Sequence, residues 1–497
     1  MIPSQIGINR TGARADSALG KAGRAAHSYV GTMTTPAQPA RATIAILGGG
    51  ITGLTAAFRL VSRGYSVRLF EQTRRLGGSV GSECTEGWLV ERGPNSLLES
   101  EPALAEIVQS LGLQDQLIPS LPTAKKRFIV RRGQLCDLPM SPGGFFKTPL
   151  FSFRGKLRLF GDLFRRPRTR PTDISLGEFI RQHFGQEAVD YGLNPFVSGV
   201  YAGDPGKLSA QYAFPKLWAL EQSHGSILRG MGAAAKARRA ANGGQRPPRP
   251  RLISFARGLQ TLVDALAARL PEGSVQLGAR VEAVWSGPRW QVRWHDGQTS
   301  HTEVFDKVLC ALPSGGLSQL AVGADGAMPL AGLAQLENPP VSSLFLGFRR
   351  EQVRHPLDGF GALIPALERR PELGILFSSS LFAGRAPEGH VALTVMVGGV
   401  RQPVLARQST DELLATVTPS LRDLLGVSGA PVFVRHNFWP AAIPQYNLGY
   451  GRHLAAIEAC ERAHPGLFIG GNTRDGISVP QCLRAGINLA GKADSPS

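Results

Sequence analysis

The sequence is short of cysteines, acidic residues and long apolar runs, and each shortage excludes a class of protein. Five cysteines occur in 497 residues, with no C-x-x-C pair and no cysteine and histidine at ligand spacing. A disulfide framework and a zinc site are therefore disfavoured, no metal site is predicted, and the thiols are expected to be reduced. No apolar run reaches the roughly 18 residues that a membrane-spanning helix needs.

Basic residues are in excess. The chain has 55 Lys and Arg against 37 Asp and Glu, which gives a formal net charge of +18 at pH 7. Such a surplus favours an anionic partner, which could be nucleic acid, an anionic membrane or an acidic small molecule, and charge cannot choose among them. The length and the 42% hydrophobic content are enough for two or three domains with cores of their own.

Residues 1–42 are rich in Ala, Arg, Ser and Gly and contain one acid, Asp16. This composition is typical of an organelle transit peptide, and equally of a start assigned too early, with Met33 as the first residue. Because the whole chain is rich in Ala, Arg, Gly and Pro, we expect a bacterial protein in which this segment is disordered. The alternative is a plastid or mitochondrial protein with a targeting segment.

Directly after this segment, the pattern predicts a strand, a glycine turn, a helix and a second strand. The predicted elements are a buried strand over Thr43–Leu47, a helix over Ile51–Ser62 and a strand over Ser66–Glu71. The turn between the first two reads Gly48, Gly49, Gly50. This order of elements is typical of a dinucleotide-binding unit.

The glycines have the G-x-G-x-x-G spacing, and each has a physical task. Gly48 makes the tight turn, Gly50 lets the backbone approach a pyrophosphate, and Gly53 lets the helix pack on the strand. Glu71, about twenty residues on, would accept hydrogen bonds from an unphosphorylated ribose, which favours FAD or NAD. The helix start supplies amide donors and a positive dipole end, so we add Gly49, Ile51 and Thr52 to the cofactor contacts.

The next segment, "EQTRRLGGSVGSECTEGWLVERGPNSLLES", resembles the flavin-containing oxidases of the amine oxidase and protoporphyrinogen oxidase superfamily. The resemblance implies a non-covalent FAD, with the double glycine along the cofactor and the later glycine turn near the flavin. Two surface turns are the ordinary alternative. The contacts implied here are Gly78, Ser79, Gly93, Pro94, Asn95 and Ser96.

The C-terminal stretch "HPGLFIGGNTRDGISVPQCLRAGINLAGKA" is read as a strand over Leu467–Ile469, a glycine turn and a helix from about Val479. In the same superfamily this unit sets backbone amides against the flavin ring. The matching positions are Asn472, Ile477, Ser478 and Val479. Val281 matches a backbone contact to the adenine, although it reads equally as a core strand residue.

The middle of the chain is the most discriminating part. The stretch 194–205, "NPFVSGVYAGDP", looks like neither a good helix nor a plain strand, and a loop with an awkward turn is the ordinary interpretation. Over the longer stretch "NPFVSGVYAGDPGKLSAQYAFPKLWALEQSHGSI" it resembles the protoporphyrinogen oxidases. Further similarity in "KKRFIVRRGQLCDLP", "DGFGALIP", "GILFSSSLFAGRAP" and "IPQYNLGYGRHL" extends the resemblance over Thr43 to Ala490.

The resemblance implies an oxidoreductase of porphyrin and haem biosynthesis. Its reaction is the oxidation of protoporphyrinogen IX to protoporphyrin IX in three two-electron transfers to flavin N5, with dioxygen as acceptor and hydrogen peroxide as product. No catalytic side chain is expected, because the cofactor carries the hard step. The alternatives are coproporphyrinogen oxidation, a flavin amine oxidase or carotenoid desaturase, and a basic membrane- or nucleic-acid-binding protein that keeps FAD structurally.

Four substrate contacts are implied residue by residue. Arg127 would pair with a porphyrinogen propionate, Gly199 would let main chain lie against the macrocycle, and Leu363 and Phe382 would sandwich it. From the residues themselves, Arg127 reads as a solvated cation in a basic run, and Leu363 and Phe382 read as core.

A basic, aromatic-rich segment, "FFKTPLFSFRGKLRLFGDLFRRPRTRPT", follows the first of these contacts and suits a lipid interface. Its apolar positions are Phe146, Phe151, Phe153, Leu157, Phe160 and Phe164. A solvated basic face is the alternative, and no nucleic-acid-binding module accompanies it. We therefore predict a peripheral protein of the inner membrane on its cytoplasmic side, with no nucleic-acid partner. The resemblance leaves open a homodimer and a contact with ferrochelatase or another enzyme of the next step.

We predict an α/β multi-domain fold with a Rossmann-like FAD-binding domain, a mixed-sheet substrate domain and a helical membrane-associating insertion. The FAD-binding domain is expected over 43–125, 252–330 and 440–497, and the substrate domain over 126–145 and 331–439. The helical domain is expected over 146–251, with a flexible basic loop at about 233–251.

Overall fold

The computed structural model describes residues 42–494 except 140, 167–169, 171 and 246–249. The predictions for residues 1–41 and for the tip of the basic loop, 246–249, lie outside the described residues.

A five-stranded parallel sheet gathers strands from three distant parts of the chain. Its order is β10-β2-β1-β14-β21, and every neighbouring pair is parallel. The strands are Val275–Leu277, Ser66–Glu71, Thr43–Leu47, Lys307–Cys310 and Leu467–Ile469, respectively. The predicted strands and the helix α1 (Ile51–Ser62) are confirmed with their predicted bounds.

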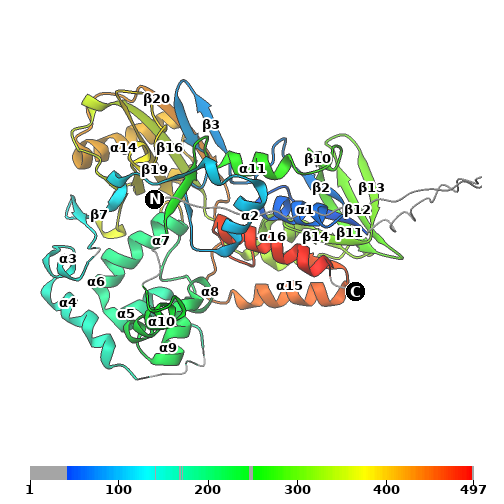
Figure 1. Cartoon of the computed structure of the whole chain (residues 1–497), viewed down its shortest axis with the longest axis horizontal. Helices are drawn as coiled ribbons and strands as arrows, with labels where there is room; N and C mark the ends of the chain where they lie inside the picture. Colours follow the sequence, from blue (N-terminus) through cyan, green and yellow to red (C-terminus); the bar gives the residue numbers. More distant parts are fainter. Residues whose placement is uncertain (1–41, 140, 167–169, 171, 246–249, 495–497) are drawn as a thin grey trace, which may run out of the picture. The chain divides into compact units, whose positions relative to one another are not determined.

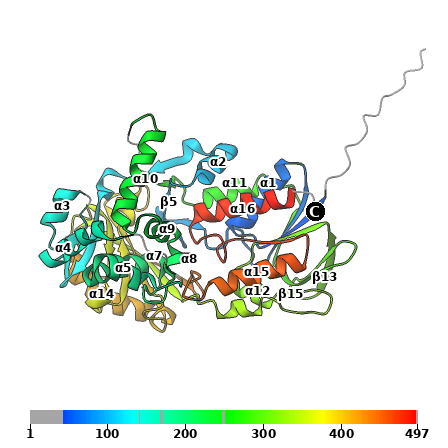
Figure 2. The same ribbon diagram turned by 90° about the horizontal axis from the view of Figure 1, so that it is seen from below.

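Helices cover one face of this sheet, and a second sheet covers the other. The helices that share the core of the first face are α1, α2 (Pro102–Leu111), α11 (Gln260–Ala267) and α16 (Val479–Asp494). Figure 2 shows α1, α11 and α16 on one side and α15 (Gly451–Ala463) on the other. The second sheet has the order β13-β12-β11-β15, over Ser300–Phe305, Trp290–His295, Arg280–Ser286 and Ala321–Val322.

A seven-stranded mixed sheet forms the other large core, as predicted. Its order is β20-β16-β19-β18-β17-β7-β8, in which β17 and β7 are parallel and the other pairs antiparallel. The strands are Phe433–Trp439, Val341–Arg349, His390–Gly398, Glu372–Leu376, Gly359–Leu363, Lys126–Arg131 and Gln134–Asp137. Helix α14 (Thr410–Leu425) packs on one face, where Leu413, Val417 and Leu421 join the apolar core.

Smaller elements connect these sheets. The strands are β3 (Ser82–Thr85), β4 (Trp88–Glu91), β5 (Leu97–Leu98), β6 (Leu117–Pro119) and β9 (Leu252–Phe255), and the helices are α12 (Ser314–Gln319) and α13 (Ser378–Leu381).

A helical segment runs from residue 142 to residue 241. It contains α3 (Pro142–Lys147), α4 (Phe153–Phe160), the 3₁₀ turn η3 (Gly161–Phe164), α5 (Leu176–Phe184), α6 (Gln186–Ala188), α7 (Asn194–Tyr201), α8 (Ala210–Ala213), α9 (Pro215–His224) and α10 (Ile227–Ala241). In the described part of the chain, no helix is both long and apolar enough to cross a membrane.

Two predictions about this segment are wrong. Residues 194–201 form the helix α7, because a π-helical turn, η4 (Val189–Leu193), precedes it and widens the backbone where Pro195 would clash in a regular helix. Residues 233–241, expected to belong to a flexible loop, complete α10. Their sequence, "AAAKARRAA", is rich in alanine and arginine, which have high helix propensity.

Candidate active site

Two glycine turns, Gly48–Gly50 and Gly77–Gly78, meet at the start of α1, and a third glycine, Gly93, packs against Ser79 beside the second turn. The amide of Gly77 donates to the carbonyl of Gly49 over 2.9 Å, and Gly77 pairs with Gly50 as an isolated parallel bridge. A Cβ on Gly78 would lie 3.3 Å from the Cα of Gly50, and a Cβ on Gly93 would collide with the carbonyl of Ser79. The turns predicted to follow the cofactor are therefore in direct contact with one another.

The first turn has the shape that a pyrophosphate requires. A Cβ on Gly53 would collide with the carbonyl of Gly48, so the helix can pack this closely only without a side chain. Among the residues that the structure describes, in contrast, a Cβ on Gly50 would meet nothing within 4 Å, and no side chain caps α1. The open space and the free helix start suit an anionic group, and the residues present fit a dinucleotide cofactor.

Glu71 stands at the end of β2, as predicted, and it also supports the glycine turn. The side chain is 8% exposed. One carboxylate oxygen accepts from the amide of Gly49 over 2.8 Å, and the other accepts from the amide and hydroxyl of Thr73 over 2.8 Å each. A carboxylate has about four lone-pair positions, so Glu71 retains capacity for a ribose hydroxyl.

Val281 lies close to the Glu71 end of the sheet. The amide of Ala279 donates to the carbonyl of Glu71 over 2.9 Å, which places the start of β11 beside the end of β2. The register of β11 shifts between Val281 and Ala283, so backbone groups leave the regular ladder there. This local irregularity is compatible with the predicted backbone contact of Val281.

The C-terminal turn closes on the same helix start. A Cβ on Gly471 would lie 3.6 Å from the hydroxyl of Thr52, and that hydroxyl donates to the carbonyl of Cys482 over 3.2 Å. Asn472 is thus placed on a turn that touches α1. The C-terminal glycine turn and the start of α1 are therefore in contact.

Two tyrosines that the sequence analysis missed hold this turn in place. The hydroxyl of Tyr446 donates to the carbonyl of Asn472 over 2.5 Å, and that of Tyr450 donates to the carbonyl of Thr473 over 2.6 Å. Burial raises the pKa of both phenols, so they remain donors at neutral pH. The sequence carries no local signal for them, because Tyr446 and Tyr450 lie in a turn before α15 and the carbonyls they bind are more than twenty residues away.

The start of α16 is closed by its own side chains. The hydroxyl of Ser478 accepts from the amide of Gln481 over 3.3 Å, and the Gln481 carbonyl oxygen accepts from the Ser478 amide over 3.0 Å. This reciprocal pair is a capping box. Ile477 packs beside Tyr446 and Tyr450, and Val479 is buried.

Two of the predicted substrate residues are in contact. Gly199 lies on α7, and a Cβ there would collide with the Cδ2 of Leu363 on β17. The predicted role of Gly199 implies that a side chain there would push on the substrate. In the structure, such a side chain meets the side chain of Leu363 first. Phe196 and Val200 flank Gly199 on α7 with exposed apolar side chains, and the sequence analysis did not single them out.

Arg127 lies on the same face of the mixed sheet as Leu363. Ile129, two residues after Arg127 on β7, pairs with Leu363, while Phe128 pairs with Ala362 towards the α14 core. The guanidinium of Arg127 is 5.4 Å from the ring of Phe360 and is exposed. It forms no ion pair within the described ranges, so its charge is available to a ligand.

Phe382 comes from the loop after α13 and is 1% exposed. Its ring is 5.4 Å from the guanidinium carbon of Arg385, which is itself 3% exposed. Arg385 donates to the hydroxyl of Ser254 over 2.6 Å and faces a carboxylate oxygen of Glu91 at 3.3 Å. Its Nη1 has no hydrogen-bond partner among the residues that the structure describes.

Glu91 precedes the glycine turn at Gly93 and faces Arg385. Burial raises the pKa of Glu91 to about 7, because loss of solvation outweighs the attraction of Arg385 and the hydrogen bond from Ser82. The pair thus links the turn predicted to contact the flavin with the loop of Phe382. The sequence offered no signal for it, because the two residues are almost three hundred positions apart.

The described ranges contain no group of three or more His, Cys, Asp or Glu that could hold a metal. The arrangement offers backbone amides, open glycine surfaces, an apolar wall and one free guanidinium. These features fit a dinucleotide cofactor.

Comparison with known proteins agrees with this geometry. The family of flavin containing amine oxidoreductases matches residues 51–493. Protoporphyrinogen oxidase 2 of Arabidopsis thaliana, chloroplastic and mitochondrial, is 36% identical over 90% of this chain and 92% of its own length. The coproporphyrinogen III oxidase of Bacillus subtilis (strain 168) is 29% identical over 89% of this chain and 96% of its own.

A solved structure supports the fold. The crystal structure of a protein from Exiguobacterium sp. 255-15 superposes with a TM-score of 0.77 at 24% identity and covers 91% of this chain and 98% of that one.

Proposed function

The chain belongs to the flavin containing amine oxidoreductases, and from that premise we propose that this FAD-dependent porphyrinogen oxidase converts protoporphyrinogen IX to protoporphyrin IX, with dioxygen as electron acceptor. The observation that carries the proposal is the similarity of nearly the whole chain to the Arabidopsis protoporphyrinogen oxidase. The contact between Gly199 and Leu363, on the sheet face that carries Arg127, supports it.

Bound FAD would supply the redox chemistry, which moves two electrons at a time from the substrate to dioxygen and yields hydrogen peroxide. Three rounds remove six electrons and six protons in all. The chain contributes binding and orientation. The Gly48–Gly50 turn and the start of α1 receive the pyrophosphate, and Glu71 receives the ribose.

The substrate residues then set the pose of the macrocycle. Arg127 pairs with a propionate through its planar fork, which fixes the edge of the ring. Gly199 and Leu363 form a flat apolar wall on which the ring lies. No side chain is assigned to proton transfer, because no described acid or base lies among the grouped substrate residues.

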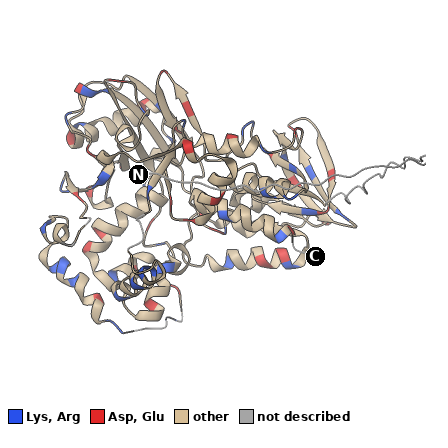
Figure 3. Cartoon of the chain, in the orientation of Figure 1, with Lys and Arg blue, Asp and Glu red and all other residues tan. Residues whose placement is uncertain are grey.

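The helical segment is the proposed membrane-facing part. Phe146, Phe153, Leu157 and Phe164 expose large apolar side chains there, and Phe146 stacks on Phe160 at 6.0 Å. Figure 3 shows that Lys and Arg outnumber acids along α3 and α4. Exposed aromatics among cations suit a lipid interface.

Coproporphyrinogen III is the second candidate substrate, and the similarity to the Bacillus protein favours it. It carries two further propionates, which need further cations. The two substrates are separated by measuring porphyrin fluorescence in air with each porphyrinogen in turn, against heat-killed protein to correct for autoxidation. Faster oxidation of protoporphyrinogen supports the proposal, and faster oxidation of coproporphyrinogen overturns the substrate choice.

Arg127→Ala tests the placement of the propionate. We expect KM to rise about tenfold, because one charged hydrogen bond to the substrate is lost, and kcat to change little. Lys125→Ala, an exposed cation two residues away, is the matched control and should behave as the parent chain. Equal KM values for the two variants would remove Arg127 from the substrate site.

A further inference from the structure

A cavity of about 430 Å³ lies in the helical segment, away from the glycine turns. Its walls come from α4 and from the end of α5 with the turn that follows. Three arginines line it, Arg154, Arg158 and Arg181, together with Phe184 and Glu187. The lining is therefore strongly cationic, with one aromatic side.

Two of the three guanidiniums have no partner of opposite charge. Arg181 is held by Glu178 at 2.7 Å, whereas Arg154 and Arg158 form no ion pair within the described ranges. Glu187 pairs at 3.5 Å with Arg131, which does not line the cavity, and one of its oxygens also accepts from the amide and hydroxyl of Ser152 at 2.9 Å each.

Arg154 and Arg158 are four residues apart on α4, so they extend from one face of the helix. A guanidinium presents a planar fork of donors that matches the oxygens of a phosphate. Two such forks on one wall of a cavity form a receptor for a phosphate group.

Exposed apolar side chains neighbour the cavity arginines along α4 and η3. Phe153 is 75% exposed and Phe164 is 85% exposed, and Leu157 lies between the two arginines on α4. A free phosphate ion would gain nothing from these side chains. A phosphate attached to acyl chains would contact both the cations and the aromatics.

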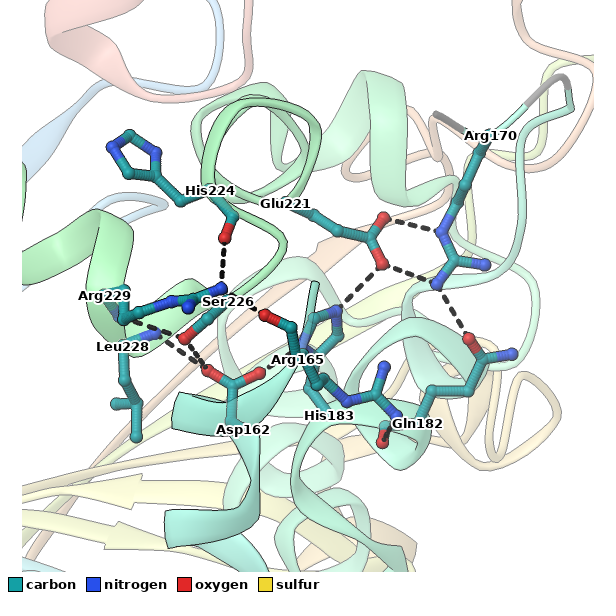
Figure 4. Close-up of polar contacts among 10 residues, drawn as sticks. All are labelled: Asp162, Arg165, Arg170, Gln182, His183, Glu221, His224, Ser226, Leu228 and Arg229. Atoms are coloured by element: carbon teal, nitrogen blue, oxygen red, sulfur yellow. Dashed lines mark hydrogen bonds and ion pairs between the residues drawn. The ribbon is translucent and has the colours of Figure 1, made fainter. Parts of the chain in front are cut away.

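A buried polar network fixes the two walls of the cavity against each other (Figure 4). Asp162, in η3 directly after α4, binds the Nδ1 of His183 on α5 and accepts from the hydroxyl of Ser226 over 2.8 Å. The Nε2 of His183 is 3.0 Å from Glu221, which binds Arg170 at 2.6 Å. Asp162 and His183 are fully buried, so α4 and α5 are held at fixed positions.

We propose that this cavity binds the phosphate headgroup of an anionic phospholipid, with Arg154 and Arg158 as its ligands and Phe153 and Phe164 in the acyl region. The inference rests on the proposed membrane contact of the helical segment and gives it a site and a lipid class. It does not depend on which porphyrinogen is oxidised.

The test uses the full-length, FAD-loaded chain and vesicles of phosphatidylcholine with or without phosphatidylglycerol, at physiological salt. Arg154→Gln/Arg158→Gln is compared with Arg238→Gln/Arg239→Gln on α10. The second variant removes the same amount of charge from two exposed arginines outside the cavity. A basic residue near an anionic surface contributes about fivefold in affinity. We expect the cavity variant to lose about thirtyfold on phosphatidylglycerol vesicles, and the α10 variant less than about threefold.

Equal losses in the two variants would show a general attraction of the basic surface and overturn the site. No preference of the parent chain for phosphatidylglycerol would also overturn it. Inorganic phosphate and short-chain phosphatidylglycerol are then compared, at equal ionic strength, as competitors that release the protein from vesicles. If inorganic phosphate is as effective as the lipid, the cavity binds the free ion instead.

Porphyrinogen oxidation in detergent solution separates this inference from the proposed function. Both double variants should oxidise the substrate at the rate of the parent chain, because their arginines lie outside the substrate residues. If the parent chain oxidises no porphyrinogen but the two variants still differ in binding to phosphatidylglycerol vesicles, the headgroup site is supported and the proposed function is wrong. If oxidation is normal but the variants do not differ in vesicle binding, the headgroup site is wrong and the proposed function is supported.

Discussion

The parallel-sheet region and the helical segment use opposite means to hold their parts in place. In the parallel-sheet region, backbone approaches backbone: Gly53 faces the Gly48 carbonyl, and Gly93 faces that of Ser79. In the helical segment, buried charges hold the helices, with His183 between Asp162 and Glu221. A site that must receive a rigid cofactor thus excludes side chains, whereas a surface segment with a small apolar core is held by polar groups.

The largest effect is expected where a side chain would enter the glycine turn. In Gly53→Ala the new Cβ collides with the backbone of Gly48, so both the thermal midpoint and flavin content should fall steeply. Gly50→Ala is the matched variant, because its Cβ meets no protein atom within 4 Å. Its apoprotein should unfold like the parent apoprotein, while FAD affinity drops. Equal apoprotein stability in both variants would contradict the assignment of separate roles.

Removing one charge of the buried network should come next. Glu221→Gln leaves Arg170 and His183 with a neutral partner, and breaking such a buried pair costs about 3–5 kcal/mol. We expect rapid proteolysis within residues 142–241 and unchanged flavin absorbance. Glu178→Gln, which removes an exposed partner of Arg181, should have no measurable effect.

The same network predicts loss of stability in acid. Burial raises the pKa of both Asp162 and Glu221, but hydrogen bonds outweigh it and lower both values. His183, the Leu228 amide and Ser226 act on Asp162, and Arg170 and His183 act on Glu221. The contribution of the two carboxylates is therefore present above the unfolded-state values and is lost as the pH falls through the depressed folded-state values. Proteolysis of the helical segment at pH 3 and pH 6 should show the difference in the parent chain and less of it in Glu221→Gln.

A moderate effect is expected where the helical segment touches the mixed sheet. Gly199→Ala forces Leu363 to move, so KM for the porphyrinogen should rise about tenfold through misplacement of the wall. The double variant Gly199→Ala/Leu363→Ala makes room for the new methyl group and should recover part of the loss. Additive losses in the double variant would show that the two residues act separately.

The last effect is confined to a range of pH and concerns Glu91. Its pKa is raised to about 7 from the ordinary 4.5, so the folded state binds a proton that the unfolded state has released. Stability should therefore decline as the pH rises from about 4.5 to 7, by at most about 1.4 kcal/mol per pH unit. Glu91→Gln should flatten this slope in denaturant titrations, and an unchanged slope would assign it to another group.

Much of the parallel-sheet region was predictable, because its signals are local. The bounds of β1, α1, β2 and β21 follow from short apolar runs and the glycines between them. The helix α7 was not predictable from residues 194–205, because the π-helical turn that accommodates Pro195 lies before them. The proline-rich residues that follow α10 favour a loop, whereas the alanine-rich run before them has a high helix propensity.

The sequence by itself determined the dinucleotide turn, the acid that closes it and the excess of basic and aromatic residues in the helical segment, since each is a pattern of neighbouring residues. Only the tertiary structure decided that Gly77 lies on Gly49, that Arg385 faces Glu91, and that Arg154 and Arg158 share a cavity with Arg181. The physical reason is that such contacts depend on how sheets and helices pack. The spacing of neighbouring residues in the sequence does not determine which distant side chain they will contact.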